Sequence, residues 1–263
     1  MRISSVPCGI ILVKLLCAAM FSAIQCAGIA SATIPLVTDD TDTQGRGDFQ
    51  VELPAVYSHE DERSTRENHV AAGAILTYGI AENVDLYISG AYLWQRTRED
   101  GTGSKASGIS DTVMGVKWRF YEKDGLSFAV NPTLLLPSGD EEKGLGTGRV
   151  GYGLSVITTK RLKPWAFDAA VAFTRNENRA EDRKNLWSIG FAAEFDLTER
   201  FRLVGNIGAY RNRDPGSSTS CAFLLGGFIY SPADILDIGF GTKFGLTRPE
   251  PDVAVIFGLT FHF

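Results

Sequence analysis

The feature of this sequence that most constrains its fold is a repeated alternation of apolar residues with polar or small ones. In the segment 126–136, leucine, phenylalanine and valine share one parity, while serine, alanine and asparagine share the other. Successive side chains of a β-strand point to opposite faces, so the pattern predicts strands with one apolar face. About twelve such segments follow one another up to the last residue, a number typical of membrane barrels.

The connections between these segments alternate in length. Residues 81–83, 122–124 and 161–163 are short connections. The long polar ones are 59–67, 97–108, 137–148, 176–184, 212–218 and 246–252. Outer-membrane barrels have this layout, with tight periplasmic turns and longer outer loops. The sequence therefore predicts an all-β fold over residues 47–263, an antiparallel transmembrane β-barrel of about twelve strands.

A secreted β-sandwich or soluble barrel is the alternative, because its strands also alternate apolar and polar residues. The positions of the aromatic residues separate the two classes. All four tryptophans have the apolar parity, Trp94 and Trp187 beside long loops and Trp118 and Trp165 beside short turns. Aromatic girdles at two membrane interfaces have this arrangement, whereas a soluble core gathers its aromatic residues in the middle of strands. The tryptophans favour the membrane barrel.

The polar parity of the strands carries charged and amide side chains that we expect to line a wet lumen. Burying so many unpaired charges in the packed interior of a soluble barrel would be costly. The candidate lumen-lining residues are Lys117, Arg119, Asn131, Glu194, Arg202, Asn206, Asp237 and Lys243. Opposite charges such as Glu194 with Arg202, or Asp237 with Lys243, either pair into a plug or line a narrow path.

Two of these candidates, Lys117 and Arg119, occupy neighbouring inward positions of one predicted strand. They either form a local positive step or pair with acids. The positive step is the outcome we expect, and its field would favour anionic solutes such as aromatic carboxylates.

The first 32 residues have the three parts of a secretory signal peptide. Arg2 and Lys14 precede an apolar stretch, and the small residues 30–32 end the segment. A membrane-anchoring helix is the alternative, but it needs roughly twenty apolar residues, about twice the length present. Of the four cysteines only Cys221 lies beyond this segment, so the mature chain can form no intramolecular disulfide. We expect residues 33–46 to be a periplasmic segment that either stays outside the barrel or folds inward as a plug.

Composition and motifs argue against several other functions. The 26 basic and 31 acidic residues give a net charge of -5, without the basic field that nucleic acid requires. The three histidines, His59, His69 and His262, fall on opposite rims of a barrel, so we expect no metal site. The G-x-G-x-x-G match at 146–151 enters a strand rather than a helix, so we expect no cofactor.

An enzyme is a further class to weigh, because outer-membrane phospholipases are barrels of this size. Those enzymes need a serine and a histidine that are close in sequence and occupy adjacent lipid-facing positions. No His-x-Ser sequence occurs in the chain. A nucleophile and base of that kind are therefore absent, and we expect no enzymatic activity.

Two internal motifs and the chain end resemble those of a known family. Residues 108–120 read Gly-Ile-Ser-Asp and then Gly-Val-Lys-Trp-Arg-Phe, and residues 131–148 contain Leu-Pro-Ser-Gly-Asp and Gly-Leu-Gly-Thr-Gly. They resemble the outer-membrane proteins of the MetA-pathway of phenol degradation family. The resemblance implies an outer-membrane barrel that takes up aromatic or other hydrophobic small molecules, and it implies no particular site residue. The terminal Phe263 resembles the ending that the outer-membrane assembly machinery reads.

Taken together, these observations predict an outer-membrane channel or uptake pore for small solutes, aromatic or hydrophobic ones included. A non-conducting structural or adhesive barrel is the alternative. The expected partners are the lipid bilayer, the assembly machinery at Phe263 and a small solute.

We expect the mature protein to begin at or near Thr33, because small side chains at 30–32 suit the signal peptidase and a polar segment follows. N-terminal sequencing of the protein from the membrane fraction tests this. Retention of Met1 would contradict both the export prediction and the compartment.

Overall fold

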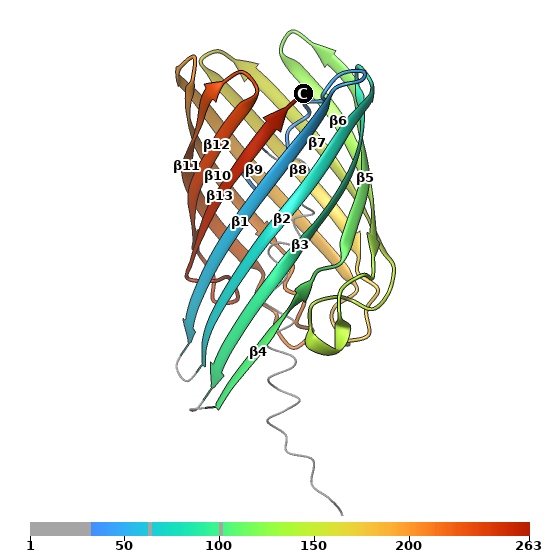
Figure 1. The fold of residues 1–263 in the computed structure, drawn as a ribbon, viewed down its shortest axis with the longest axis vertical. Coiled ribbons are helices and arrows are strands. Elements are labelled where there is room, and N and C mark those ends of the chain that lie inside the picture. Colours follow the sequence, from blue (N-terminus) through green and yellow to red (C-terminus); the bar gives the residue numbers. More distant parts are fainter. Residues whose placement is uncertain (1–32, 63–64, 100–101) are drawn as a thin grey trace, which may run out of the picture.

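The computed structural model describes residues 33–62, 65–99 and 102–263, so the predicted signal peptide lies outside the described residues and stays a prediction. Thirteen strands and one short 3-10 helix, η1 (Glu141–Lys143), make up the elements of this part of the chain (Figure 1). The strands are β1 (Phe49–Glu62), β2 (Thr65–Ala81), β3 (Val84–Glu99), β4 (Thr102–Ile109), β5 (Thr112–Lys123), β6 (Leu126–Leu136), β7 (Gly151–Leu162), β8 (Trp165–Arg175), β9 (Asn185–Thr198), β10 (Phe201–Tyr210), β11 (Cys221–Ala233), β12 (Leu236–Gly245) and β13 (Val253–His262). Among the described residues, no helix has the length and apolarity needed to cross a membrane.

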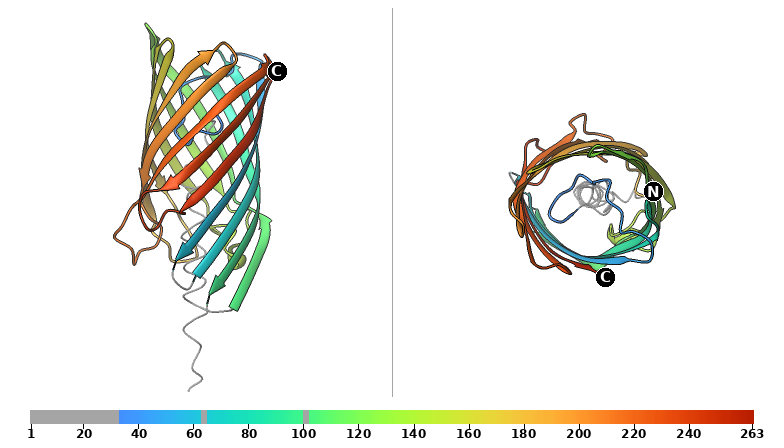
Figure 2. Two further views of the ribbon diagram at one scale, coloured as in Figure 1. Left: turned by 90° about the vertical axis from the view of Figure 1, so that its left-hand side faces the viewer. Right: turned by 90° about the horizontal axis from the view of Figure 1, so that it is seen from above.

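The strands form one antiparallel sheet that closes on itself. Each strand pairs with its neighbour in the chain, except that β5 pairs with β3 instead of β4, and β1 pairs with β13 from Gln50–His262 to His59–Val253. Figure 2 shows the resulting ring of strands from above. The wall of the barrel consists of twelve strands, and β4 is an additional strand paired with β3. The predicted fold class, an antiparallel barrel of about twelve strands, is confirmed.

The outer ends of the first strands differ from the prediction. Residues 97–108, expected to be a loop, largely form the end of β3 and the strand β4, and residues 59–67 lie mainly in β1 and β2. The inner half of β3 pairs with β5, whereas its outer half, from Tyr92, pairs with β4. These strands continue beyond the apolar part of the wall, where both faces are polar. The apolar–polar alternation therefore ends before the strands do, and the sequence of their outer ends resembles that of a loop.

The outer face of the barrel is apolar. All four tryptophans are exposed, between 39% and 48% of their surface, and leucine, isoleucine, valine and phenylalanine side chains are exposed between them. An exposed apolar band of this extent on a closed sheet is the surface of a protein embedded in a bilayer. With short turns at one end and long loops at the other, the barrel is of the outer-membrane type, and its short turns face the periplasm.

Placing arginine on the two faces of β7 tests this orientation. Val156 is 50% exposed on the outer face, and its neighbour Ser155 has the inward parity. We expect Val156→Arg to destabilise the barrel by roughly 2–4 kcal/mol, because the charge enters hydrocarbon. Ser155→Arg should cost less, because its side chain reaches the lumen. Unfolding titrations in lipid vesicles measure both, and equal costs would mean that the faces are assigned wrongly.

Candidate functional site

The chain enters the barrel before β1 begins. Residues 33–44, called the inner segment below, lie within the ring of strands (Figure 2). Backbone N–H groups of Val37 and Thr38 donate to Asn206 Oδ1 on β10, at 2.8 and 2.9 Å. Further along, Thr41 N donates to Thr159 Oγ1 on β7 at 3.0 Å, and Gln44 N donates to the Asp85 carboxylate on β3. The inner segment therefore crosses the lumen from one wall to the opposite one.

A buried ion pair holds the middle of the inner segment. Lys117 Nζ on β5 lies 2.7 Å from Asp39 Oδ1 and 3.6 Å from Asp40 Oδ1, and it donates to the Asp40 carbonyl oxygen at 3.1 Å. The Lys117 side chain is only 1% exposed. Asn131 on β6 adds a contact, since its Nδ2 lies 3.5 Å from Asp39 Oδ2 while its Oδ1 accepts from Tyr87. Breaking one side of such a pair leaves an unpaired charge in a buried place, which is costly.

The expected positive step at Lys117 and Arg119 is wrong. Carboxylates of the inner segment neutralise Lys117, and Arg119 pairs with Glu122 at 3.2 Å near the periplasmic turns. Glu52 and Asp85, both fully buried, place two more carboxyl groups on the same side of the lumen. This part of the lumen therefore presents no unneutralised cation, and the basis for anion selection is lost.

Three other predicted candidates form a row at the periplasmic end of the lumen. Arg202 on β10 lies 2.9 Å from Glu194 on β9 and 3.6 Å from Asp237 on β12. Asp237 also lies 3.2 Å from His262 Nε2 on β13. The Glu194–Arg202 pairing agrees with expectation. Asp237 and Lys243 do not pair, because six residues along one strand separate them by about 20 Å.

Lys243 instead lies at the outer end and pairs with a residue that the sequence analysis missed. Its Nζ is 2.5 Å from Glu250 Oε1, and the hydroxyl of Tyr210 donates to the other Glu250 oxygen. Glu250 belongs to the connection between β12 and β13 and is fully buried. Proline and charged residues surround it in the sequence, so the connection reads as a solvated loop. Its inward position depends on partners that lie on other strands.

The connection between β6 and β7 also folds inward, and it joins the two sequence motifs. Asp111 accepts from Gly139 N at 3.0 Å, Thr147 N at 2.8 Å and Thr147 Oγ1 at 2.6 Å. Leu145 is 1% exposed and packs on inward residues of β2 and β3. A Cβ at Gly139 would lie 2.4 Å from the Leu145 carbonyl oxygen, so a side chain does not fit there. The motifs are thus structural parts of an inward-folded loop.

Ion pairs join this loop to its neighbour at the outer end. Arg179 in the β8–β9 connection lies 2.5 Å from Glu141, and its backbone N–H donates to the Thr147 carbonyl at 3.0 Å. Within the β6–β7 connection, Lys143 Nζ donates to Asp140 at 2.6 Å, and this contact lowers the pKa of the Asp140 carboxyl. The outer loops therefore support one another over the lumen.

Glycines on the wall receive the first residues of the inner segment. A Cβ at Gly239 on β12 would lie 2.1 Å from the Ile34 carbonyl oxygen, and one at Gly190 on β9 would lie 2.2 Å from Thr38 Oγ1. One at Gly258 on β13 would lie 2.6 Å from the Ile34 side chain. Side chains at these positions would push the segment away from the wall. The glycine-rich parity of the last strands thus accommodates the inner segment.

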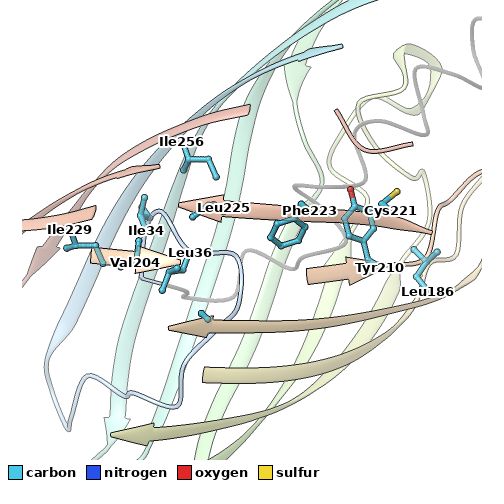
Figure 3. Packing of buried hydrophobic residues seen from close by; sticks show 11 residues of the cluster. Ile34, Leu36, Leu186, Val204, Tyr210, Cys221, Phe223, Leu225, Ile229 and Ile256 are labelled. Carbon is cyan, nitrogen blue, oxygen red and sulfur yellow. The ribbon is translucent and has the colours of Figure 1, made fainter. Parts of the chain in front are cut away.

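An apolar surface covers one side of the lumen. Val204 on β10, Phe223, Leu225 and Ile229 on β11, and Ile256 on β13 are buried and point inward (Figure 3). Ile34 and Leu36 of the inner segment belong to the same cluster. Asp85 on β3, Lys117 on β5 and Asn131 on β6 lie on the opposite side, together with a smaller apolar cluster on β2, β3, β5 and β6. The larger apolar cluster and the buried ion pair of Lys117 therefore lie on different sides of the lumen, and the inner segment contacts both.

Comparisons with known proteins agree on the fold. The sequence model of the family described as "Putative MetA-pathway of phenol degradation" matches residues 34–263. No curated protein sequence matches the chain. The COG4313 outer membrane channel from Pseudomonas putida F1 is similar with a TM-score of 0.69 and 12% identity, over 85% of this chain and 98% of that one. The NanC porin is similar with a TM-score of 0.54 and 9% identity, over 80% and 98%.

The translocator domain of the autotransporter NalP from Neisseria meningitidis has the same type of fold. Its TM-score is 0.54 at 8% identity, over 85% of this chain and 91% of that one. At identities this low, the likeness concerns the architecture. Channels, porins and a translocator share it, so function has to be argued from the lumen of this chain.

Reversing the buried ion pair tests what holds the inner segment. Removing one partner of a buried pair costs roughly 3–5 kcal/mol, so we expect Lys117→Asp to release the segment. Thr41 is fully buried, so a Thr41→Cys probe in a Cys221→Ser background reports whether the segment is released. In the Lys117→Asp variant, this probe should react with a maleimide at least about tenfold faster than in the protein that keeps Lys117. The double variant Lys117→Asp/Asp39→Lys should restore protection.

Lys123, exposed at the end of β5, provides the control, and Lys123→Asp should leave the probe protected. Unchanged protection in Lys117→Asp would mean that the ion pair does not hold the segment in the lumen.

Proposed function

We propose, from the premise that the chain belongs to the family described as "Putative MetA-pathway of phenol degradation", that it is an outer-membrane channel for small apolar solutes, aromatic ones included. The proposal rests on the observation that the inner segment, and not wall side chains alone, lies in the lumen. A small barrel without a channel fills its interior with side chains of its own strands. Here the inner segment, which belongs to none of the wall strands, enters that space and contacts β5, β7 and β10.

The apolar side of the lumen supports the solute class. Leu225 and Ile229 are at most 1% exposed, and Ile34 and Leu36 of the inner segment pack in the same cluster. If the segment moves away, these wall residues face the lumen. Covering them again removes apolar surface from water, which favours an apolar solute at roughly 25 cal/mol per Å². A sugar of the same size gains little from such a wall.

The connection between the inner segment and β1 supports its movement as a unit. Gly45 and Gly47 have φ angles of +92° and +97°, a region that residues with a side chain rarely adopt. Two glycines in three residues provide a short joint between segment and wall. The segment can then leave the lumen while β1 keeps its pairing with β2 and β13.

Planar-bilayer recordings test the channel and its selectivity together. We expect deletion of residues 33–44 to raise the single-channel conductance well above that of the mature protein, because the inner segment no longer fills the lumen. Phenol should then block the ion current of the shortened protein, and a sugar of similar size should not. Leu225→Gln/Ile229→Gln should weaken block by phenol at least about tenfold, through loss of two apolar contacts.

Ser155→Gln, on the opposite wall, is the matched control and should leave block by phenol unchanged. Absence of conductance in the shortened, folded protein would contradict the channel and favour a structural barrel. Conductance with equal block by phenol and sugar would retain the channel and overturn the apolar selectivity.

A further inference from the structure

Four cations gather on the outer face of β2–β4, beyond the apolar band. Arg66, Arg96, Arg98 and Lys105, called the basic patch below, are all exposed. Their strands place them together, because Arg66 is the partner of Arg98 across β2–β3 and Arg96 is the partner of Lys105 across β3–β4. The intervening β3 residue Thr97 is buried on the inner face. In a chain with a net charge of -5, such a concentration of positive charge is unusual.

The arrangement of the basic patch is unfavourable by itself. Like charges directly opposite each other on neighbouring strands repel and destabilise the sheet. Arg66 has a partner in Asp61, with 2.6 Å between Arg66 NH2 and Asp61 Oδ2. Among the described parts of the chain, Arg96, Arg98 and Lys105 make no ion pair within 4 Å. Within residues 65–99 and 102–263, three cations of the patch therefore have no carboxylate partner.

At another place on the outer rim, two neighbouring cations are neutralised. Arg175, at the outer end of β8, lies 2.7 Å from Glu177, and Lys184 at the start of β9 lies 3.3 Å from the same carboxylate. Those cations alternate with acids in the sequence, as expected for a solvated loop. The basic patch differs because its cations face one another within regular strands.

The basic patch lies at the depth of lipid headgroups. Trp94 and Tyr92 on β3 are exposed, with ring centroids 4.6 Å apart, and aromatic rings of this kind mark the membrane interface. Arg96 follows Trp94 on the same face, about 7 Å farther along the strand. Figure 1 shows β1–β4 extending beyond the rest of the wall at this end. Since the short turns face the periplasm, this end faces the outer leaflet.

We propose that the basic patch binds the phosphorylated sugar headgroup of the glycolipid that forms the outer leaflet, lipid A of lipopolysaccharide. Guanidinium groups recognise phosphate oxygens through paired hydrogen bonds, and cations beside a membrane interface attract anionic headgroups. The aromatic rings of Tyr92 and Trp94 lie where the acyl chains of the same lipid begin. The proposal rests on the orientation of the barrel in the membrane and is independent of whether the lumen conducts.

Native mass spectrometry of the full mature protein in detergent tests the proposal. The probes are bisphosphorylated lipid A, the same lipid with both phosphates removed, and inorganic phosphate. We expect one bisphosphorylated lipid A to remain bound, and Arg96→Ser/Arg98→Ser/Lys105→Ser to weaken binding roughly a hundredfold, since each cation near an anionic headgroup contributes about fivefold. Arg96→Lys/Arg98→Lys, which keeps the charge, should retain most of the affinity.

The control variant, Lys123→Ser/Lys163→Ser/Arg200→Ser, lacks three exposed cations at the opposite rim. It should bind lipid A as the unaltered protein does. Heat-dependent mobility on gels verifies that every variant is a folded barrel. Equal binding by the two triple variants, or equal binding of the dephosphorylated lipid, would overturn the proposal. Competition by millimolar inorganic phosphate that removes all bound lipid would assign the patch to free anions instead.

Discussion

Within a bilayer no water reaches the backbone, so every N–H and C=O group of a spanning strand needs a partner in the protein. The pairing of β1 with β13 meets this requirement, and at the last residue Phe49 and Phe263 exchange backbone hydrogen bonds at 3.1 and 2.9 Å. Closure assigns one face of each strand to lipid and the other to an enclosed space. That space must hold water, side chains or a further part of the chain. The inner segment follows from this constraint, because it satisfies polar groups that the closed wall turns inward.

The sequence predicted the structure well in the part of the barrel where contact with lipid restricts the residue types. The apolar parity, the tryptophan positions and the alternating loop lengths all reflect the bilayer, and they were sufficient for the barrel class. The motifs around 108–120 and 131–148 were sufficient for the family. Outside the hydrocarbon this selection ends, and β4 with the outer part of β3 carries arginine, lysine, serine and threonine on exposed positions. Strands without an apolar face have no period to detect, so the sequence analysis interpreted them as a loop.

The candidate site was predicted in part for a similar reason. Parity gives the direction of a side chain, and the structure has Lys117, Asn131 and Asn206 on the lumen side of their strands, each contacting the inner segment. Their partners are about 80 to 170 residues away in the chain, and no local pattern encodes such distances. The Asp39–Asp40 pair, just after the predicted signal peptide, was the available signal. Its charge complements Lys117, and it explains why the expected positive step does not exist.

The chemistry that fills the lumen also bears on whether the inner segment can leave. A segment held by apolar packing alone would be at least as stable, since a buried ion pair gains little over well-packed hydrophobic groups. The ion pair of Lys117 differs from apolar packing, because the free energy needed to separate its charges depends on water. Water solvates both charges once the lumen opens. The segment also contacts Asn206 and Thr159 through hydrogen bonds that water can replace one by one. Glycines on β9, β12 and β13 leave room for the segment at three further positions. These polar contacts and glycine positions together define the closed position, and the proposed channel would open as water replaces the polar contacts.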